Sequence, residues 1–267
     1  MKDNRTCNSL GFACALLMVL FGFTANAVAD SVPAGWTCSG SCGSLGADGV
    51  VSLSPIGSST YQYVTTSGST STAVLPTGAL GSETNGSTLA SSAFTATAGT
   101  DLNFYFDFVT SDGAEYADYA WAELFNSSND PVAMLFTART ESSGSIVPGA
   151  GMPTPVATLN PSSVPILAGT AWSPLGGNSG TCWSTGCGNT GWINSDYTIA
   201  DAGSYYLEIG VTNWGDEGYD TGLAMDGVMV DGQPILPTSA TPEPSSFLLL
   251  ASGLAGLVGV VKRKLFA

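Results

Sequence analysis

Short apolar or alternating runs recur along the middle of the chain, and clusters of Gly, Ser, Asn, Asp and Pro separate them. Runs of this length and spacing are typical of a β-sandwich, and no stretch between residues 30 and 236 has a convincing helical period. The clearest predicted strand covers residues 101–110, where Leu102, Phe104, Phe106 and Phe108 fall on one face. Such a row of side chains at period two predicts a buried face rather than a ligand site.

The other predicted strands are similar short runs, at 50–53, 61–64, 89–97, 119–125, 132–140, 192–199, 204–211 and 221–230. Six prolines fall within residues 148–174. We therefore expect residues 141–175 to form a long surface excursion with one short strand. The total of about nine or ten strands predicts an all-β fold, a two-sheet β-sandwich of the jelly-roll type.

The start of the chain departs from this strand pattern. Lys2 and Arg5 precede an apolar centre over residues 10–23, and Ala27-Val28-Ala29 has the small-x-small form of a signal peptidase site. Cleavage there removes a signal helix over residues 1–29 and leaves Asp30 as the mature N-terminus. We therefore predict an exported protein.

The end of the chain departs from it as well. Residues 247–261 form an uncharged apolar run that a basic triplet at 262–264 terminates, and Pro242, Glu243 and Pro244 stand shortly before it. A helix over the apolar run rises about 22 Å, short of the ~30 Å hydrocarbon core, so it needs its flanking residues to span a bilayer. The triplet stays in the cytoplasm, which places everything before Pro242 outside.

A Pro-Glu-Pro tripeptide, an apolar helix and a basic end in this order resemble the PEP-CTERM sorting signal of Gram-negative bacteria that make exopolysaccharide. The resemblance implies a Pro-rich linker at 237–244 and a sorting helix over 245–267. It also implies a membrane-embedded exosortase that cuts near the tripeptide. A transient inner-membrane anchor would then give way to the cell surface or the extracellular matrix. An ordinary C-terminal membrane anchor is the alternative.

Composition excludes several classes of function. Between Asp30 and Pro237, Arg139 is the only basic side chain, against nineteen of the chain's 21 acidic residues. This charge repels phosphates, which excludes nucleic acid as a partner. The chain has no histidine, so Ser-His-Asp and Cys-His catalysis and His-ligated zinc are excluded too. We therefore expect a protein that is not an enzyme.

Four cysteines remain after export: Cys38, Cys42, Cys182 and Cys187. Their close spacing within each pair and the oxidising destination favour two local disulfides that pin Gly/Ser-rich turns. The alternatives are one zinc ion held by all four thiolates and long-range pairing between the two pairs.

Two acidic loops, at 111–118 and 213–220, directly follow predicted strands. Their acids are Asp112, Glu115 and Asp118 in the first loop and Asp216, Glu217 and Asp220 in the second. Hard cations such as Ca²⁺ prefer carboxylate and carbonyl oxygens, and the chain offers almost no basic residues as partners. We expect a structural Ca²⁺ site that uses one or both loops. Solvated acidic turns are the alternative, because neither loop matches the helix–loop–helix calcium pattern.

Aromatic side chains accompany these acids. Trp214 and Tyr219 lie in the second acidic loop, and Trp183 lies between the second pair of cysteines. An aromatic face near carboxylates suits a bound sugar, so these three residues are candidate glycan contacts, with packing as their alternative role. A carboxylate pair would also suit a glycosidase, whose two acids lie about 5–9.5 Å apart.

The region over residues 30–236 also resembles the β-rich ectodomain of a group of PEP-CTERM proteins. The resemblance rests on Gly35-Trp36-Thr37-Cys38 and on Val211-Thr212-Asn213-Trp214-Gly215-Asp216, and it implies no activity. The function we expect is that of a non-catalytic, exosortase-sorted surface or matrix protein, associated with extracellular polysaccharide. The alternatives are a carbohydrate-active hydrolase and an adhesin.

Overall fold

The computed structural model describes residues 32–70, 76 and 78–235, all within one compact unit, Ser31–Ala267. The predicted signal helix with its cleavage site at Ala29 and Asp30 lies outside the described residues. The linker and the sorting helix with Pro242, Glu243 and Pro244 lie outside them too. Within the described part of the chain, no helix is long and apolar enough to cross a membrane.

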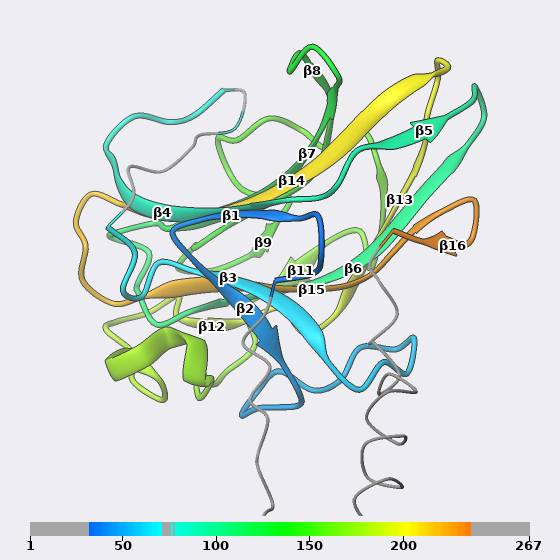
Figure 1. The fold of residues 1–267 in the computed structure, drawn as a ribbon. Coiled ribbons are helices and arrows are strands. Elements are labelled where there is room, and N and C mark those ends of the chain that lie inside the picture. The colour runs from blue at the N-terminus through cyan, green and yellow to red at the C-terminus, as the bar shows by residue number, and fades with distance from the viewer. Residues whose placement is uncertain (1–31, 71–75, 77, 236–267) are drawn as a thin grey trace, which may run out of the picture. The chain divides into compact units, whose positions relative to one another are not determined.

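One layer is a six-stranded antiparallel sheet in the order β1-β4-β14-β7-β8, which β5 extends by pairing with β14. Figure 1 shows β4, β14 and β7 running together in this layer. Its strands are β1 Thr37–Ser39, β4 Glu83–Ala90, β5 Phe94–Ala96, β7 Tyr119–Asn126, β8 Pro131–Arg139 and β14 Gly203–Trp214.

The other layer is an eight-stranded sheet in the order β10-β13-β6-β15-β3-β2, with β12 paired to β6 and β16 paired to β15. Its longer strands are β2 Ser41–Leu45, β3 Tyr61–Thr65, β6 Asp101–Thr110, β13 Ile193–Thr198 and β15 Thr221–Val230. Its shorter ones are β10 Thr158–Asn160, β12 Gly188–Asn189 and β16 Gln233–Pro234. The two layers confirm the predicted all-β class and the β-sandwich.

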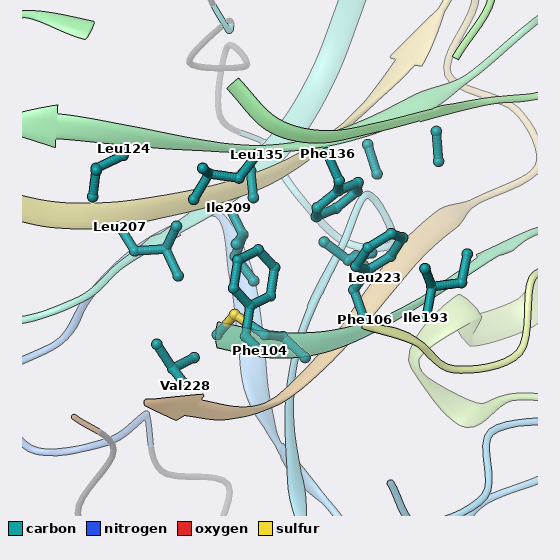
Figure 2. Packing of buried hydrophobic residues seen from close by; sticks show 14 of the residues in the cluster. Phe104, Phe106, Leu124, Leu135, Phe136, Ile193, Leu207, Ile209, Leu223 and Val228 are labelled. Atoms are coloured by element: carbon teal, nitrogen blue, oxygen red, sulfur yellow. The ribbon is translucent and has the colours of Figure 1, made fainter. Parts of the chain in front are cut away.

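The core lies between these two sheets. Leu102, Phe104, Phe106 and Phe108 of β6 are fully buried, as the period-two pattern predicted. They face side chains of the other layer, and Figure 2 shows Phe104 and Phe106 beside Phe136 of β8. Because these residues alternate with the outward-facing side chains of the same strands, each sheet can bury only one face in this core.

Two strand predictions were wrong. Residues 50–53 form no strand, because Val51 makes only an isolated bridge to Asp48 and is buried in a separate cluster with Trp172. The run 89–97 is divided between β4 and β5. Ser91 causes the break, since its backbone N–H and side-chain Oγ both bond to Leu207 of β14 in place of a regular ladder.

The Pro-rich excursion contains more structure than the single short strand that we predicted. Within residues 141–175, β9 Ser145–Val147 pairs with β11 Val164–Pro165, β10 pairs with β13, and a 3₁₀ helix, η1 Ser173–Asn178, begins. The proline pattern identified the irregularity correctly. It could not show these two- and three-residue pairings, because strands this short have no periodic pattern and β10 pairs with a strand outside the excursion.

Both pairs of cysteines form local disulfides, Cys38–Cys42 and Cys182–Cys187. This confirms the favoured pairing over zinc and over long-range bridges. The first disulfide joins β1 to β2, two strands that we did not predict because Gly, Ser and Cys give no alternation there. The second closes a loop beside the acidic end of the sandwich.

Candidate functional site

The two acidic loops meet at one end of the sandwich. β6 and β15 are antiparallel neighbours with Thr110 opposite Thr221, so the end of β6 coincides with the start of β15. Ser111 joins the loops, because its N–H and its hydroxyl both donate to the carbonyl oxygen of Asp220, at 3.1 and 2.7 Å. In Figure 1 the loop between β14 and β15 turns at the left of the view.

Asp118 is one of two buried acids at this end. It is 1% exposed, and the backbone N–H of Trp214 donates to Oδ1 at 2.8 Å. The hydroxyl of Thr221 donates to Oδ2 at 2.5 Å and lies 2.8 Å from the hydroxyl of Thr110. Burial, with a further contribution from the charge of Asp112, holds the pKa of Asp118 well above its usual range.

Asp112 continues the inward row of β6 beyond the last strand residue. It is also 1% exposed, and the backbone N–H of Gly113 donates to its Oδ1 at 2.7 Å. Burial raises the pKa of Asp112 to about 7, and the charge of Asp216 adds to the increase. Two carboxyl groups therefore lie inside the protein at this end, within range of each other's charge.

Asn213 belongs to the same cluster, and the sequence analysis missed it as a functional residue. Thr212 of β14 lies opposite Tyr119 of β7, so the next pair along this ladder is Asn213 and Asp118. Opposite residues point to the same face of a sheet, and this pair follows the inward pair Val211 and Ala120 by two residues. The signal was available: a polar residue continues the apolar row 207, 209, 211.

The remaining predicted ligands are placed differently. Glu115, Asp216 and Glu217 are exposed. Asp220 is half-buried, the Thr66 hydroxyl donates to its Oδ1 at 3.3 Å, and burial raises its pKa. Within residues 32–70, 76 and 78–235, no three His, Cys, Asp or Glu side chains are grouped so as to hold a metal ion. The six predicted acids therefore do not form one coordination sphere.

Two of the three candidate glycan contacts come together. The rings of Trp183 and Tyr219 lie 5.1 Å apart between centroids and 41° from parallel. Trp183 is 49% exposed, although it is among the largest apolar side chains of the protein. Tyr219 adopts a left-handed backbone conformation, φ 61°, which is uncommon for a residue with a Cβ.

The loop that carries Trp183 is held in place on both sides. Its ends are joined by the Cys182–Cys187 disulfide. The backbone N–H of Trp183 donates to the carbonyl oxygen of Ser111 at 2.9 Å, and the N–H of Ala114 donates to that of Thr185 at 2.9 Å. The exposed ring of Trp183 therefore projects from a loop that is fixed next to the acidic cluster.

Trp214, the third candidate, is separated from this pair. Its ring packs in a cluster with Tyr119 and Trp121, and its Nε1–H donates to the carbonyl oxygen of Gly81. The guanidinium of Arg139 lies 5.1 Å from the ring centroid of Trp214. Trp214 is therefore half-buried in a packing contact, and its role as a glycan contact stays a prediction.

Comparison with known proteins adds one functional finding. A family model described as the PEP-CTERM protein-sorting motif matches residues 240–264, which confirms the resemblance drawn from Pro242, Glu243 and Pro244. The motif implies processing by an exosortase and membrane-associated sorting of an exported protein to the cell surface. Among curated proteins, no sequence matches this chain.

Several solved structures are similar, but only weakly. The enzymatically active domain of tailspike protein 4 from bacteriophage CBA120 is 12% identical, with TM-score 0.32, over 74% of this chain and 19% of that chain. The K1 cleaved adhesin domain of Lys-gingipain from Porphyromonas gingivalis W83 is 13% identical, with TM-score 0.33, over 78% and 96%. An exo-β-agarase is 11% identical, with TM-score 0.26, over 78% and 24%. This chain thus spans about a fifth of the tailspike and a quarter of the agarase. Likenesses this weak carry no argument about its activity.

Proposed function

We propose that this protein is a non-catalytic component of the cell surface or extracellular matrix that binds extracellular polysaccharide through Trp183 and Tyr219. The sorting motif supports the surface destination. The observation that carries the binding role is the exposed ring of Trp183 beside the half-buried ring of Tyr219, with ring centroids 5.1 Å apart. Exposed aromatic rings offer flat apolar faces on which the C–H faces of sugar rings can stack.

The surroundings of the pair suit a sugar better than a protein partner. The loop that carries Tyr219 also carries two exposed acidic residues, Asp216 and Glu217. Carboxylates accept hydrogen bonds from sugar hydroxyls and so fix the orientation of a stacked ring. The disulfide and the bonds of Ser111 hold the rings before binding, which lowers the entropy lost when a polymer docks.

Charge restricts which polymer can bind. Arg139 is the only basic side chain between Asp30 and Pro237, and its guanidinium donates to the carbonyl oxygens of Ala117 and Ala150 and lies over Trp214. An anionic polymer such as a polyuronate therefore meets repulsion with no cation to pair with it. The expected ligands are neutral or amine-bearing polysaccharides.

A non-catalytic role is also part of the proposal. Asp112 and Asp118 have the raised pKa that a general acid needs, but each is only 1% exposed and so does not reach a bound polymer. Glu115, Asp216 and Glu217 are exposed in turns instead. A carbohydrate-active hydrolase and an adhesin remain the competing functions.

Binding of the exported, processed protein to three soluble polymers tests the proposal: hydroxyethyl cellulose, chitosan and polygalacturonate. We expect binding to the first two and little to the third. Trp183→Ala should weaken binding about tenfold, because about 1.4 kcal/mol of stacking corresponds to that factor. Tyr219→Asn should do the same, since Asn tolerates the left-handed backbone while removing the ring.

The matched control is Tyr206→Ala, which removes a ring from a different aromatic pair, Phe125 and Tyr206, whose stacked rings lie 5.2 Å apart between centroids. Binding that this control reduces as much as Trp183→Ala, or an absence of binding to all three polymers, contradicts the proposal. Release of reducing ends would instead identify a hydrolase. Attachment of cells to bare surfaces that depends on this protein, without polymer binding, would identify an adhesin.

A further inference from the structure

The inward-facing side chains of the sandwich change from apolar to polar at the acidic end. Along most of their length β6, β7 and β14 direct apolar side chains into the core. At this end their inward rows terminate in three polar side chains, those of Asp112, Asp118 and Asn213. The exposed fractions are 1%, 1% and 0%, so all three lie inside the protein.

The buried side-chain amide of Asn213 makes no hydrogen bond within the described residues. Neither Oδ1 nor Nδ2 has a hydrogen-bond partner within the described residues, although both atoms are buried. A buried polar atom without a partner costs about 1–3 kcal/mol, so native proteins rarely leave a whole amide group in that state. The strand register directs this amide toward the side of the sheet on which Asp118 lies. A bound group that the amide oxygen of Asn213 coordinates would explain the arrangement.

Charge identifies the class of ligand. Asp112 and Asp118 are buried near each other, and the one basic side chain of this region, Arg139, directs its guanidinium to carbonyl oxygens and to the Trp214 ring. Two buried carboxylates without a countercharge repel each other in a medium where charges are weakly screened. A bound cation would remove that repulsion.

We infer that Asp112, Asp118 and Asn213 form a binding site for a hard divalent cation, with Ca²⁺ as the best fit. All candidate donors are oxygens, which suit Ca²⁺ and Mg²⁺, whereas imidazole and thiolate donors for softer metals are missing from this cluster. A mixed set of carboxylate and amide oxygens suits the irregular coordination of Ca²⁺ better than the strict octahedron of Mg²⁺.

This site differs from the six-acid set that the sequence predicted. No three acidic side chains converge in the described part of the chain, so the amide oxygen of Asn213 is an essential third ligand. The exposed Glu115 and Glu217 are not part of the site. The cation would tie the β6–β7 loop to the end of β14, directly beneath the loop that carries Trp183.

Thermal unfolding of the exported, processed protein in chelator and in rising Ca²⁺ tests the inference, together with Tb³⁺ luminescence excited through tryptophan. Trp214 is a suitable antenna, because its backbone N–H bonds to Asp118. We expect one site whose occupation raises Tm with the logarithm of the Ca²⁺ concentration above Kd. The readout needs no glycan, so its result is independent of the polysaccharide proposal.

Three variants make the test specific to these residues. Asn213→Leu should weaken Ca²⁺ binding by at least about tenfold without changing the net charge, a loss typical even of residues that only support a metal ligand. Asn213→Asp keeps an oxygen donor and should retain binding. The double variant Glu115→Gln, Glu217→Gln removes two exposed acids of the same loops and should also retain binding.

The absence of both a Tm shift and Tb³⁺ luminescence in the parent protein overturns the inference. A shift that persists in Asn213→Leu, or that the Glu115 and Glu217 changes abolish, overturns it as well, because the cation then binds elsewhere. Should Asn213→Leu fail to fold, loss of the shift in Asn213→Asp counts against the site and retention of it supports the site.

Discussion

Phe106 of β6 and Phe136 of β8 stack face to face across the sandwich, with ring centroids 3.8 Å apart and planes 8° from parallel. One ring belongs to the eight-stranded sheet and the other to the six-stranded sheet. The pair therefore joins the two layers at the centre of the core (Figure 2).

Replacing Phe106 by alanine should lower the free energy of unfolding by about 3–5 kcal/mol, because it removes a fully buried ring and leaves a cavity between the sheets. Phe125→Ala is the control, since that ring is only half-buried. Urea unfolding of both variants gives the comparison. Equal losses in the two would mean that the stack contributes little beyond ordinary surface packing.

Removing the Cys182–Cys187 disulfide should weaken both stability and polymer binding. A loop this short contributes about 2 kcal/mol through the entropy of the unfolded chain, and its loss frees the backbone of Trp183. The variant is Cys182→Ala with Cys187→Ala, and unfolding and polymer binding are measured together.

Cys38→Ala with Cys42→Ala is the matched comparison. That disulfide joins β1 to β2, and the loop of Trp183 does not depend on it. We expect a similar loss of stability with unchanged polymer binding. A parallel loss of binding in both double variants would show that stability alone, and not the position of Trp183, controls binding.

Asp107 gives a prediction about pH. Its side chain faces away from the core between the sheets, yet it is only 1% exposed. The Thr190 hydroxyl donates to its Oδ1 at 3.2 Å, and its Oδ2 has no hydrogen-bond partner within the described residues. Burial raises its pKa to about 7. The folded state therefore keeps a proton that the unfolded state loses near pH 4.

The contribution of Asp107 to stability is consequently complete below about pH 4 and is lost as the pH rises to about 7, with a slope of up to ~1.4 kcal/mol per pH unit. Asp107→Asn carries no such proton. The difference in free energy of unfolding between the parent and this variant should change between pH 4 and pH 7 and stay constant above pH 8. A pH-independent difference would show that Asp107 is ionised in the folded protein.

The sorting motif predicts the fate of the chain in the cell. Mass spectrometry of the released protein should find Asp30 at its N-terminus and should find none of residues 247–267, because processing near Pro242-Glu243-Pro244 removes the helix. Glu243→Ala should trap the protein in the membrane fraction, and Glu217→Ala is a control outside the motif. Released protein that still carries its last residues would contradict exosortase processing.

Two strands with a period-two row of apolar side chains could be predicted to the residue. β6 and β15 were predicted with the bounds that they have: the inward side chains of β6 repeat every second position, and β15 keeps this repeat up to a register shift between Asp226 and Met229. β1 and β2 consist of Thr, Ser, Cys, Gly and a single Leu, so their pairing comes from the neighbouring strands and from the disulfide. The local pattern of apolar and polar residues does not show such pairing between distant segments.

The candidate site could be predicted only in part for a related reason. The sequence showed two acidic loops, but only the pairing of β6 with β15 brings them together. Asp112 and Asp118 continue the inward rows of β6 and β7, but the sequence does not show that these rows stay buried beyond the strand ends. Asn213 was read as the first residue of a loop, whereas β14 continues to Trp214 and turns its side chain inward.

Because Arg139 is the only basic residue between Asp30 and Pro237, the ectodomain offers few sites to proteases outside the cell. Proteases of the trypsin type cut after Lys or Arg, and between Asp30 and Pro237 this chain offers them a single bond, Arg139–Thr140. Arg139 is paired with Tyr119 in a sheet, and the N–H of Thr140 donates to the carbonyl oxygen of Asp118 at 3.0 Å. Cleavage requires an extended, accessible segment, so the folded ectodomain withstands this class of enzyme for as long as β8 remains in place.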